Sequence, residues 1–232
     1  MAQEKAWENE YRKSKLLTKD NKPQSDVVRY VQYLIKQEKI DLENLNILDL
    51  GSGAGRNSFY FAEMGNNVIG LEISKTAIEI AKKYFNELMS RTVLDIKYVK
   101  QSIGEKFPID DNSIDIVLDV TSSNSLTETE REVYLQETKR VLKPEGHFFV
   151  KALCKDGDDN AKHLLKDFPG VEKDTYKMPG LEVVERVWTK EDFVRTYEPY
   201  FNILKLEKKT SYPRMNNRSY KRNFWLAYLQ NK

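Results

Sequence analysis

Two hydrophobic patterns alternate along most of the chain. Short apolar runs of strand length are separated by segments in which apolar residues recur every three or four positions, as on one face of a helix. The apolar runs are 47–50, 68–71, 96–99, 114–120 and 147–153. Helical spacing is found at 24–39, at 56–64, at Ile78, Ala81, Phe85 and Leu88, and from Thr127 to about Leu142. This alternation predicts parallel strands joined by helices, and hence a doubly wound α/β fold.

Local signals mark the ends of several of these helices. Ser74 is placed to cap one helix, and Thr127 with Glu130 forms a capping-box pattern that opens another. Pro144 and Gly146 are expected to end the helix that Thr127 begins, and to precede the strand at 147–153.

The C-terminal third of the chain departs from the alternation. Two Pro-Gly pairs and little periodicity indicate an insertion rather than another strand–helix unit. The expected elements are an insertion over 155–188 with a short helix at 161–168, a helix capped by Thr189 and ending near Tyr200, and two strands at 201–210 and 219–229. The two strands predict a C-terminal antiparallel hairpin. Together the patterns predict a mostly parallel, seven-stranded, Rossmann-like sheet.

Composition and charge narrow the class of protein. The 232 residues are 40% hydrophobic and 32% charged, which is typical of a soluble globular protein. The formal net charge of +2 is too small to indicate nucleic-acid binding by itself. Residues 1–10 lack the apolar stretch of a signal peptide, and no segment has the apolar length of a membrane span. Cys154 is the only cysteine, so we expect no disulfide and a cytoplasmic protein.

The segment DLGSGAG at 49–55 places a glycine-rich turn directly after a predicted strand. Such a turn can seat a dinucleotide or a smaller ligand. The dinucleotide fingerprint G-x-G-x-x-G requires a third glycine that lets the helix pack closely on the strand, and Arg56 holds that position here. Asp49, at the end of the strand, would repel a pyrophosphate and attract a cation. The turn therefore favours a ligand without a diphosphate.

A second acidic residue, Glu72, ends the next predicted strand. A carboxylate at this place, beside the glycine turn, can accept hydrogen bonds from both hydroxyls of a ribose. Since an acid at the end of a buried strand has little structural role, ligand binding is the favoured interpretation of Glu72. S-adenosylmethionine combines a ribose with a sulfonium and an ammonium group and lacks a diphosphate, so we predict it as the ligand.

Four motifs, in order, resemble those of the class I S-adenosylmethionine-dependent methyltransferases. DLGSGAG (49–55) and VIGLEIS (68–74) resemble the first two motifs of that family. FPIDDNSIDIVLD (107–119) is similar to its approach to the fourth strand, and YLQETKRVLKPEGHFFV (134–150) resembles its helix, turn and fifth strand. The resemblance covers 45–153 and extends to a terminal hairpin at 201–229. It implies an enzyme that transfers a methyl group from S-adenosylmethionine to an acceptor by in-line displacement.

The resemblance also implies a domain organisation. We expect one methyltransferase domain over 1–232. Its parts would be an N-terminal helical lid at 1–44, a cofactor-binding core at 45–153, an insertion or cap at 154–188, and a terminal helix and hairpin at 189–232.

Carried over to this sequence, the family's motifs imply contacts with the methionine and ribose portions of the cofactor. Gly51, Gly53 and Gly55 would form the loop beneath these portions, and Glu72 would hold the ribose. Asp49 would either anchor the loop or interact with the ammonium end. A purely structural role for Asp49, tying down the glycine turn, explains its position equally well.

The adenine end is less well matched to the family. Ile73 would pack on the ring, but Gln101-Ser102-Ile103 stands where the family often has an acid that binds the adenine amino group, so that contact falls to Ser102 or the backbone. The full set of candidates for cofactor binding is Asp49, Gly51, Ser52, Gly53, Gly55, Asn57, Glu72, Ile73, Ser102, Ile103 and Asp119.

Fewer residues indicate how the acceptor is bound. Asp119 ends the fourth predicted strand, where the resemblance places groups near the methyl donor, and it is expected to point into the cleft. The candidates for positioning the acceptor, or for a general base if one is needed, are Asp119, Tyr11 and Tyr220. Trp7 and Tyr11 lie one helical turn apart and indicate a lid, although a helix packed on the sheet would explain them equally. The polar run 121–125 lacks the Asn-Pro-Pro-aromatic motif of methyltransferases that act on amino groups of nucleic-acid bases.

A basic stretch near the C-terminus favours a second hypothesis. Its basic residues, interleaved with Tyr212 and Tyr220, are Lys205, Lys208, Lys209, Arg214, Arg218, Lys221 and Arg222. Basic groups near aromatic rings suit phosphate contact and base stacking, and a solvated hairpin explains the charges just as well.

Three functions therefore remain open. The leading hypothesis is a methyltransferase for a small molecule, because the core is compact and no recognition domain is appended. The alternatives are an RNA methyltransferase that uses the basic hairpin 205–222, and a non-catalytic, cofactor-binding partner subunit. We interpret Cys154 as a small buried hydrophobe, and the separation of His147 and His163 predicts no metal site.

Overall fold

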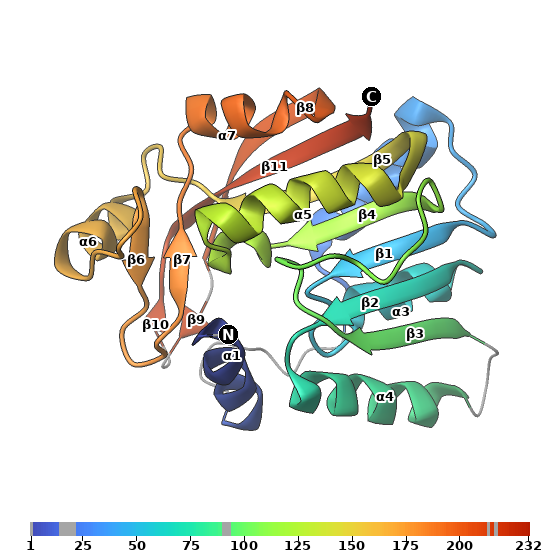
Figure 1. The fold of residues 1–232 in the computed structure, drawn as a ribbon, viewed down its shortest axis with the longest axis horizontal. Helices are drawn as coiled ribbons and strands as arrows, with labels where there is room; N and C mark the ends of the chain where they lie inside the picture. The colour runs from blue at the N-terminus through green and yellow to red at the C-terminus, as the bar shows by residue number, and fades with distance from the viewer. Residues whose placement is uncertain (1, 14–21, 90–93, 213, 216–217) are drawn as a thin grey trace.

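The computed structural model describes residues 2–13, 22–89, 94–212, 214–215 and 218–232. The strands of its main sheet are β1 (Asn46–Leu50), β2 (Asn67–Glu72), β3 (Asp95–Lys100), β4 (Ile114–Val120), β5 (Leu142–Leu153), β8 (Phe201–Ser211) and β11 (Arg222–Asn231). They lie in the order β3-β2-β1-β4-β5-β11-β8, in which β11 pairs antiparallel with β5 and with β8 and the other pairs are parallel (Figure 1). This arrangement confirms the predicted seven-stranded, Rossmann-like sheet with antiparallel strands at the C-terminus.

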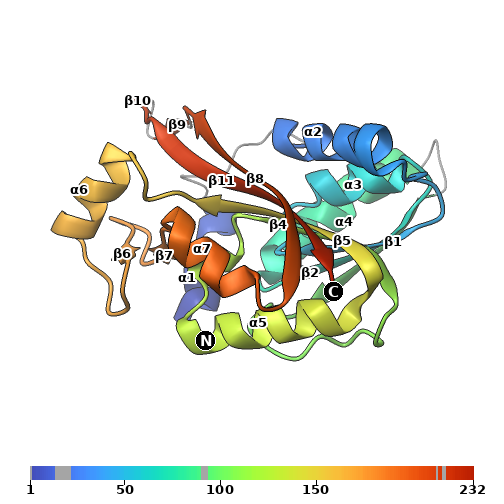
Figure 2. The same cartoon turned by 90° about the horizontal axis from the view of Figure 1, so that it is seen from above.

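Helices cover both faces of the sheet (Figure 2). They are α1 (Ala2–Arg12), α2 (Ser25–Tyr33), which continues into the π-helical turn η1 (Leu34–Glu38), α3 (Arg56–Ala62), α4 (Lys75–Met89), the 3₁₀ turn η2 (Ser123–Ser125), α5 (Glu128–Val141), α6 (Asp159–Asp167) and α7 (Lys190–Tyr197). In the part of the chain that the structure describes, none of these helices has both the length and the apolar character needed to cross a bilayer.

The two faces of the sheet bury different apolar clusters because successive strand residues point to opposite sides. On β1, Ile47 packs toward α2 and α3, whereas Leu48 packs toward α5 and α7. Helix α2 is fixed by Tyr30, whose ring stacks on Phe149 of β5 with centroids 4.9 Å apart. Of the described residues in the segment 1–44 that was expected to form a lid, those of α2 therefore pack on the sheet.

The predicted helix caps are present. Thr127 accepts a hydrogen bond from the Glu130 backbone amide, and Glu130 accepts one in return from the Thr127 amide, which completes the capping box of α5. Ser74 accepts from the Ala77 amide at the start of α4, and Thr189 accepts from the Asp192 amide at the start of α7. Helix α7 ends at Tyr197, three residues before the expected boundary near Tyr200.

Several short elements were missed by the sequence patterns. The insertion contains a two-stranded antiparallel sheet, β6 (Thr175–Lys177) and β7 (Val184–Arg186), in addition to the expected helix. Two further strands, β9 (Arg214–Met215) and β10 (Arg218–Ser219), pair with each other between β8 and β11. Elements of two or three residues are too short to display a period. Strand β5 also begins at Leu142, directly after α5, and so contains the proline and glycine that were expected to precede it.

Candidate functional site

A cavity of about 230 Å³ lies at the carboxyl ends of the parallel strands. It is lined by residues that follow β1, β2, β3 and β4, and by residues of α1. The strand order reverses between β1 and β4, which is the switch point where open α/β sheets bind ligands. The fold therefore places this cavity where a ligand site is expected.

The glycine turn shapes one wall of the cavity. Gly51 and Gly53 have φ angles of 66° and 57°, in the left-handed region that favours glycine. A Cβ atom on Gly53 would lie 2.3 Å from the Tyr11 hydroxyl, so this glycine allows α1 to approach the turn. Gly55 does not line the cavity. A Cβ there would lie 2.2 Å from the Tyr98 hydroxyl, so Gly55 serves the close packing of α3 on the sheet.

Glu72 lines the same wall, beside the glycine turn. It is 5% exposed and lines the cavity. Its carboxylate accepts hydrogen bonds from the backbone amides of Gly53 and Ser74, both at 2.8 Å. Burial raises the pKa of Glu72 above its usual range, although these hydrogen bonds act against it. Ile73, Ser102 and Ile103 line the same part of the cavity.

Asp49 also lines the cavity and is buried. Its carboxylate accepts a hydrogen bond of 2.6 Å from the Ser58 hydroxyl of α3, so it ties the glycine turn to that helix. Burial raises the pKa of Asp49 to about 6, with the Ser58 hydrogen bond and the charge of Arg56 opposing the increase. A nearby cation would restore the charged form. The predicted candidates Ser52 and Asn57 line the cavity beside it.

Asp119 points away from the cavity, contrary to the expectation that it faces the cleft. It is fully buried and does not line the cavity. Its carboxylate accepts hydrogen bonds from the Ser122 and Ser123 amides, at 2.8 and 3.2 Å, and from the Tyr134 hydroxyl, at 2.7 Å. Because Asp119 shares a strand face with Val117, it turns toward α5. It therefore fixes the loop that follows β4 instead of facing a ligand.

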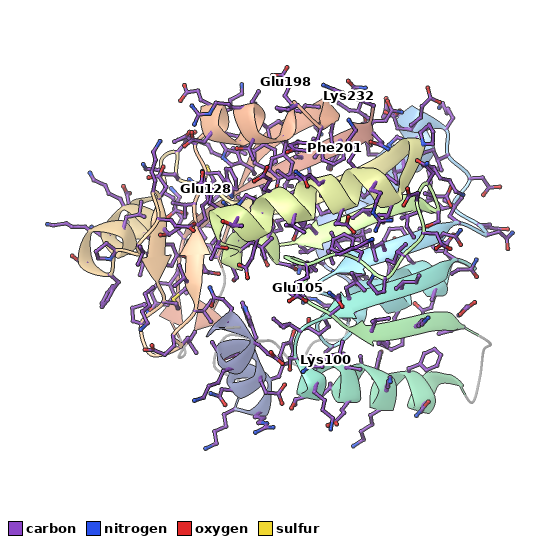
Figure 3. All side chains as sticks on the ribbon, viewed as in Figure 1. Lys100, Glu105, Glu128, Glu198, Phe201 and Lys232 are labelled. Atoms are coloured by element: carbon purple, nitrogen blue, oxygen red, sulfur yellow. The ribbon has the colours of Figure 1, made fainter. Side chains whose placement is uncertain are left out.

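Helix α1 forms the opposite wall, and three of its side chains attach it to different elements. Gln3 donates to the Ser125 carbonyl at 3.1 Å and to the Val184 carbonyl of β7 at 3.0 Å. Glu4 pairs with Lys100 at 2.6 Å, at the end of β3 next to α1 (Figure 3). The third side chain, Glu8, contacts the start of α4. The helix thus bridges the two sides of the cavity.

The contact of Glu8 with α4 is a set of three hydrogen bonds. Its carboxylate accepts from the Ser74 hydroxyl at 2.7 Å and from the Thr76 hydroxyl and amide at 2.6 and 3.2 Å. Burial alone would raise the pKa of Glu8, but these hydrogen bonds outweigh it and lower the pKa to about 2. Glu8 is therefore charged at neutral pH, at the N-terminal end of α4, where a helix favours negative charge.

Trp7 and Tyr11 of α1 both line the cavity, as does Gln3 one turn earlier. Burial, and next the charge of Glu72, raise the pKa of the Tyr11 phenol far above its usual range. Tyr11 is therefore a protonated hydroxyl that can donate a hydrogen bond and orient a ligand. As a general base it would be poor at neutral pH.

The third catalytic candidate, Tyr220, is not among the described residues that line the cavity. It lies between β10 and β11. The polar residues of the cavity that were not predicted as site residues include Gln3, Gln24 and Glu130, and Ser125 belongs to the polar run 121–125 noted in the sequence. One signal for Gln3 was available, because it lies four residues before Trp7 and eight before Tyr11, on the same helical face.

The basic hairpin has several of its charges engaged within the protein. Lys205 pairs with Glu207 at 2.9 Å, and Lys209 pairs with Asp26. Arg222 is buried and donates to the Tyr176 hydroxyl of the insertion at 3.0 Å. The side chains of Arg214 and Arg218 lie outside the described residues. RNA binding by this hairpin stays a prediction.

Two smaller expectations concern Cys154 and metals. Cys154 is fully buried, and burial raises the pKa of its thiol to about 12, so it is unsuited to act as a nucleophile. Within the described ranges, His, Cys, Asp and Glu form no group of three or more that could hold a metal ion.

The polar groups of the cavity fit a ribose-containing ligand with a cationic end. Two buried carboxylates, Glu72 and Asp49, face it together with the apolar side chains of Ile73 and Ile103. Ser52 and Ser125 also line the cavity, and their hydroxyls are buried without a hydrogen-bond partner among the residues that the structure describes. Buried hydroxyls of this kind normally bind a ligand or water. S-adenosylmethionine, the predicted cofactor, meets these requirements.

Comparison with known proteins matches the core of the chain to methyltransferases. A family model described as "Methyltransferase domain" matches residues 48–150. The chain is 26% identical over 175 residues to the 2-heptyl-1-hydroxyquinolin-4(1H)-one methyltransferase of Mycobacteroides abscessus, an alignment that covers 73% of this chain and 67% of that protein. Other curated methyltransferases match over 30–52% of their lengths, so the chain spans about half of those proteins or less.

Solved structures share the fold over nearly the whole chain. An S-adenosylmethionine-dependent methyltransferase from Methanosarcina mazei matches with a TM-score of 0.71 at 19% identity, covering 86% of this chain and 97% of that one. The 1,6-didemethyltoxoflavin-N1-methyltransferase of Burkholderia thailandensis, with bound 1,6-didemethyltoxoflavin and S-adenosylhomocysteine, matches with a TM-score of 0.70 at 14% identity. That alignment covers 100% of this chain and 88% of the other.

Proposed function

We propose that this chain methylates a small-molecule acceptor. The premise is that it belongs to the class I S-adenosylmethionine-dependent methyltransferases, which use S-adenosylmethionine as methyl donor. The acceptor would bind between α1 and the loop that follows β4. The observation that carries the proposal is the cavity itself, in which the predicted cofactor residues and the aromatic face of α1 form opposite walls.

We propose the following cofactor contacts. Glu72 binds the ribose hydroxyls, since a carboxylate has about four lone-pair sites and the amides of Gly53 and Ser74 leave some of them free. Ile73 and Ile103 enclose the adenine ring, with Ser102 at its polar edge. Asp49 faces the ammonium end. The cationic ligand stabilises the charged form of this carboxylate, whose pKa burial has raised.

The acceptor side combines apolar and polar groups. Trp7 and Leu126 supply apolar surface, and the Ser125 hydroxyl, buried and without a partner among the described residues, supplies one hydrogen-bonding group. This combination suits a compact, planar molecule with a polar substituent. The name of one similar protein, the 2-heptyl-1-hydroxyquinolin-4(1H)-one methyltransferase, supports an acceptor of that kind.

The residues around the reacting atoms align the acceptor and exclude water. When bound, S-adenosylmethionine supplies a methyl group that is already activated by its sulfonium sulfur. Tyr11, held over the glycine turn and protonated, can orient the acceptor or the cofactor through its hydroxyl. Holding the acceptor nucleophile in line with the methyl group is then the main contribution of the protein.

Binding of S-adenosylhomocysteine to a Glu72→Ala variant tests the cofactor site. Charge-assisted hydrogen bonds contribute about 1.5–3 kcal/mol, so the variant should bind roughly 10- to 100-fold more weakly in a calorimetric titration. Glu79→Ala is the matched control, because Glu79 is an exposed acid of α4 that forms a surface pair with Lys75. Equal affinities of Glu72→Ala and Glu79→Ala would contradict the assignment.

A second experiment identifies the class of acceptor. The protein is incubated with methyl-labelled S-adenosylmethionine and a size-fractionated cell extract, with and without ribonuclease. We expect label in the small-molecule fraction. Label in large, ribonuclease-sensitive material would instead favour an RNA acceptor. Cofactor binding without any label would favour a non-catalytic partner subunit.

A further inference from the structure

Two arginines lie against one indole ring behind the wall of the cavity. Arg131 lies near the start of α5, and Arg186 is the last residue of β7, two positions before Trp188. The guanidinium carbons of Arg131 and Arg186 lie 5.1 and 4.1 Å from the centre of the Trp188 ring. Strand β7 and the N-terminal end of α5 lie close together in Figure 1, and Figure 3 labels Glu128 at that end of α5.

Neither arginine has an acidic partner in the part of the chain that the structure describes. No salt bridge among those residues involves Arg131 or Arg186. Glu128 and Glu172 exert only a long-range influence on Arg131, and the Glu172 carboxylate accepts from the Glu128 amide at 3.0 and 3.1 Å. Two arginines therefore contact one ring without a counter-charge from the described residues in direct contact.

Several N–H donors of Arg131 and Arg186 also lack a hydrogen-bond acceptor within the described ranges. Arg131 is 2% exposed, and its Nη2 donates to the Leu126 carbonyl at 2.6 Å. Its Nε and Nη1, and the Nε of Arg186, are buried and have no acceptor among the described residues. Burial, and next the positive charge of Arg186, lower the pKa of Arg131 to about 10.

Buried charges in proteins are normally paired, because removing an ion from water carries a large penalty. The cation–π contacts with Trp188 offset only part of that penalty. A guanidinium group presents a planar fork of donors that matches the oxygens of a carboxylate or phosphate. A small oxyanion would supply both the missing charge and the missing acceptors.

We propose that Arg131, Arg186 and Trp188 form a binding site for a small oxyanion, a carboxylate or a phosphate. The site adjoins the acceptor wall, since Arg131 binds the carbonyl of Leu126, which lines the cavity. The oxyanion is therefore either a free ion or an anionic group of the acceptor. The proposal does not depend on methyl transfer, because it rests on charges and donors outside the cofactor site.

Thermal unfolding of the full chain at constant ionic strength tests the site, with inorganic phosphate, benzoate and neutral benzamide as probes. We expect phosphate or benzoate to raise the unfolding midpoint in a saturable manner, and benzamide to leave it unchanged. Arg186→Gln should require at least tenfold more of the same anion for half of the effect. Arg195→Gln, which changes an exposed arginine of α7, should behave like the parent.

The pattern of responses distinguishes the sources of the oxyanion. A rise with phosphate that Arg186→Gln lacks assigns the site to a free ion. A rise with benzoate alone, lost in the same variant, assigns it to the anionic group of an acceptor. The proposal is overturned if neither anion raises the midpoint of the parent, or if Arg186→Gln responds as the parent does. Either result leaves the label-transfer experiment unaffected, so a failed oxyanion site and a failed methyltransferase assignment are distinguishable.

Discussion

The two walls of the cavity are held by different interactions. On the cofactor wall, Glu72 is fixed by backbone amides close to it in the sequence or in the adjacent turn, at 2.8 Å from Gly53 and Ser74. On the opposite wall, α1 is attached through side chains, among them Gln3 and Glu8, to elements far away along the chain. Glu72 itself belongs to β2, which is paired on both sides within the main sheet and is lost only with the fold, whereas a helix attached by side chains can detach locally.

This difference has a functional meaning. The cofactor wall is expected to keep its shape whether or not a ligand is bound, which limits the entropy lost on cofactor binding. The α1 wall can open to exchange the acceptor, at the expense of a few hydrogen bonds. Substitutions that affect one wall and spare the other provide the means to test the comparison.

The largest effect is expected at Asp119, whose carboxylate fixes the loop that follows β4. Asp119→Ala leaves the Ser122 and Ser123 amides and the Tyr134 hydroxyl without their acceptor in a buried site. Unsatisfied buried donors cost about 1–3 kcal/mol each, so with three of them the free energy of unfolding in a urea titration should fall by at least about 3 kcal/mol. Affinity for S-adenosylhomocysteine should change far less than in Glu72→Ala. A comparable loss of affinity would show that the walls are not independent.

An intermediate effect is expected at Gly53, where the two walls meet. Gly53→Ala introduces left-handed strain of about 1–2 kcal/mol and places a Cβ 2.3 Å from the Tyr11 hydroxyl. Gly65→Ala is the matched control, because Gly65 has φ 83° and no atom within 4 Å of the added Cβ. Calorimetric titration with S-adenosylhomocysteine should show at least about tenfold weaker binding for Gly53→Ala alone.

Removing the hydroxyl in the double variant Gly53→Ala/Tyr11→Phe should restore part of this affinity. The Cβ would then meet ring carbon at 3.5 Å, an ordinary contact distance. If the double variant binds no better than Gly53→Ala, the contact between the walls does not contribute and strain alone explains the loss.

The smallest effect is expected from the titration of Asp49. Its pKa is raised from 3.8 to about 6, so the folded protein binds more protons than the unfolded chain between these pH values. Stability from this group is therefore present below pH 4 and is lost as pH rises to 6. Asp49→Asn removes that loss, so its free energy of unfolding in a urea titration should exceed that of the parent at pH 7 and not at pH 4.

Burial favours the protonated form of Asp49, whereas a bound ligand favours its charged form. The ammonium group of the ligand favours the charged carboxylate, so binding of S-adenosylhomocysteine to the parent should tighten between pH 5 and 7, and Asp49→Asn should lack this trend. Calorimetry at several pH values measures both. Identical pH profiles of the two proteins would exclude the proposed contact between Asp49 and the ammonium end.

The cofactor wall could be predicted from the sequence because its geometry is local. The turn at 51–55, the strand-end position of Glu72 and the caps at Ser74 and Thr127 are encoded within a few residues of one another. The fold followed for a similar reason, since each strand and helix has its own period and their alternation leaves few topologies.

The rest of the site could not be predicted because it depends on contacts over long distances along the chain. Nothing near Gln3 in the sequence indicates that it binds carbonyls of Ser125 and Val184. The orientation of Asp119 was wrongly predicted, although the strand pattern contained the information: it shares its face with Val117, which packs on the α5 side. Its position at a strand end suggested the cleft, but the alternation of side chains decided its direction.

The position of β11 affects how the protein can fold during its synthesis on the ribosome. This strand lies between β5 and β8, yet both of these strands precede it in synthesis. Until residues 222–231 have left the exit tunnel, β5 has an open edge and β8 has no place in the sheet. The sheet of the nascent chain therefore remains incomplete, with unpaired backbone groups exposed to other chains, until β11 has been synthesised. The edge of β5 therefore needs protection during translation, although it is fully paired in the mature fold.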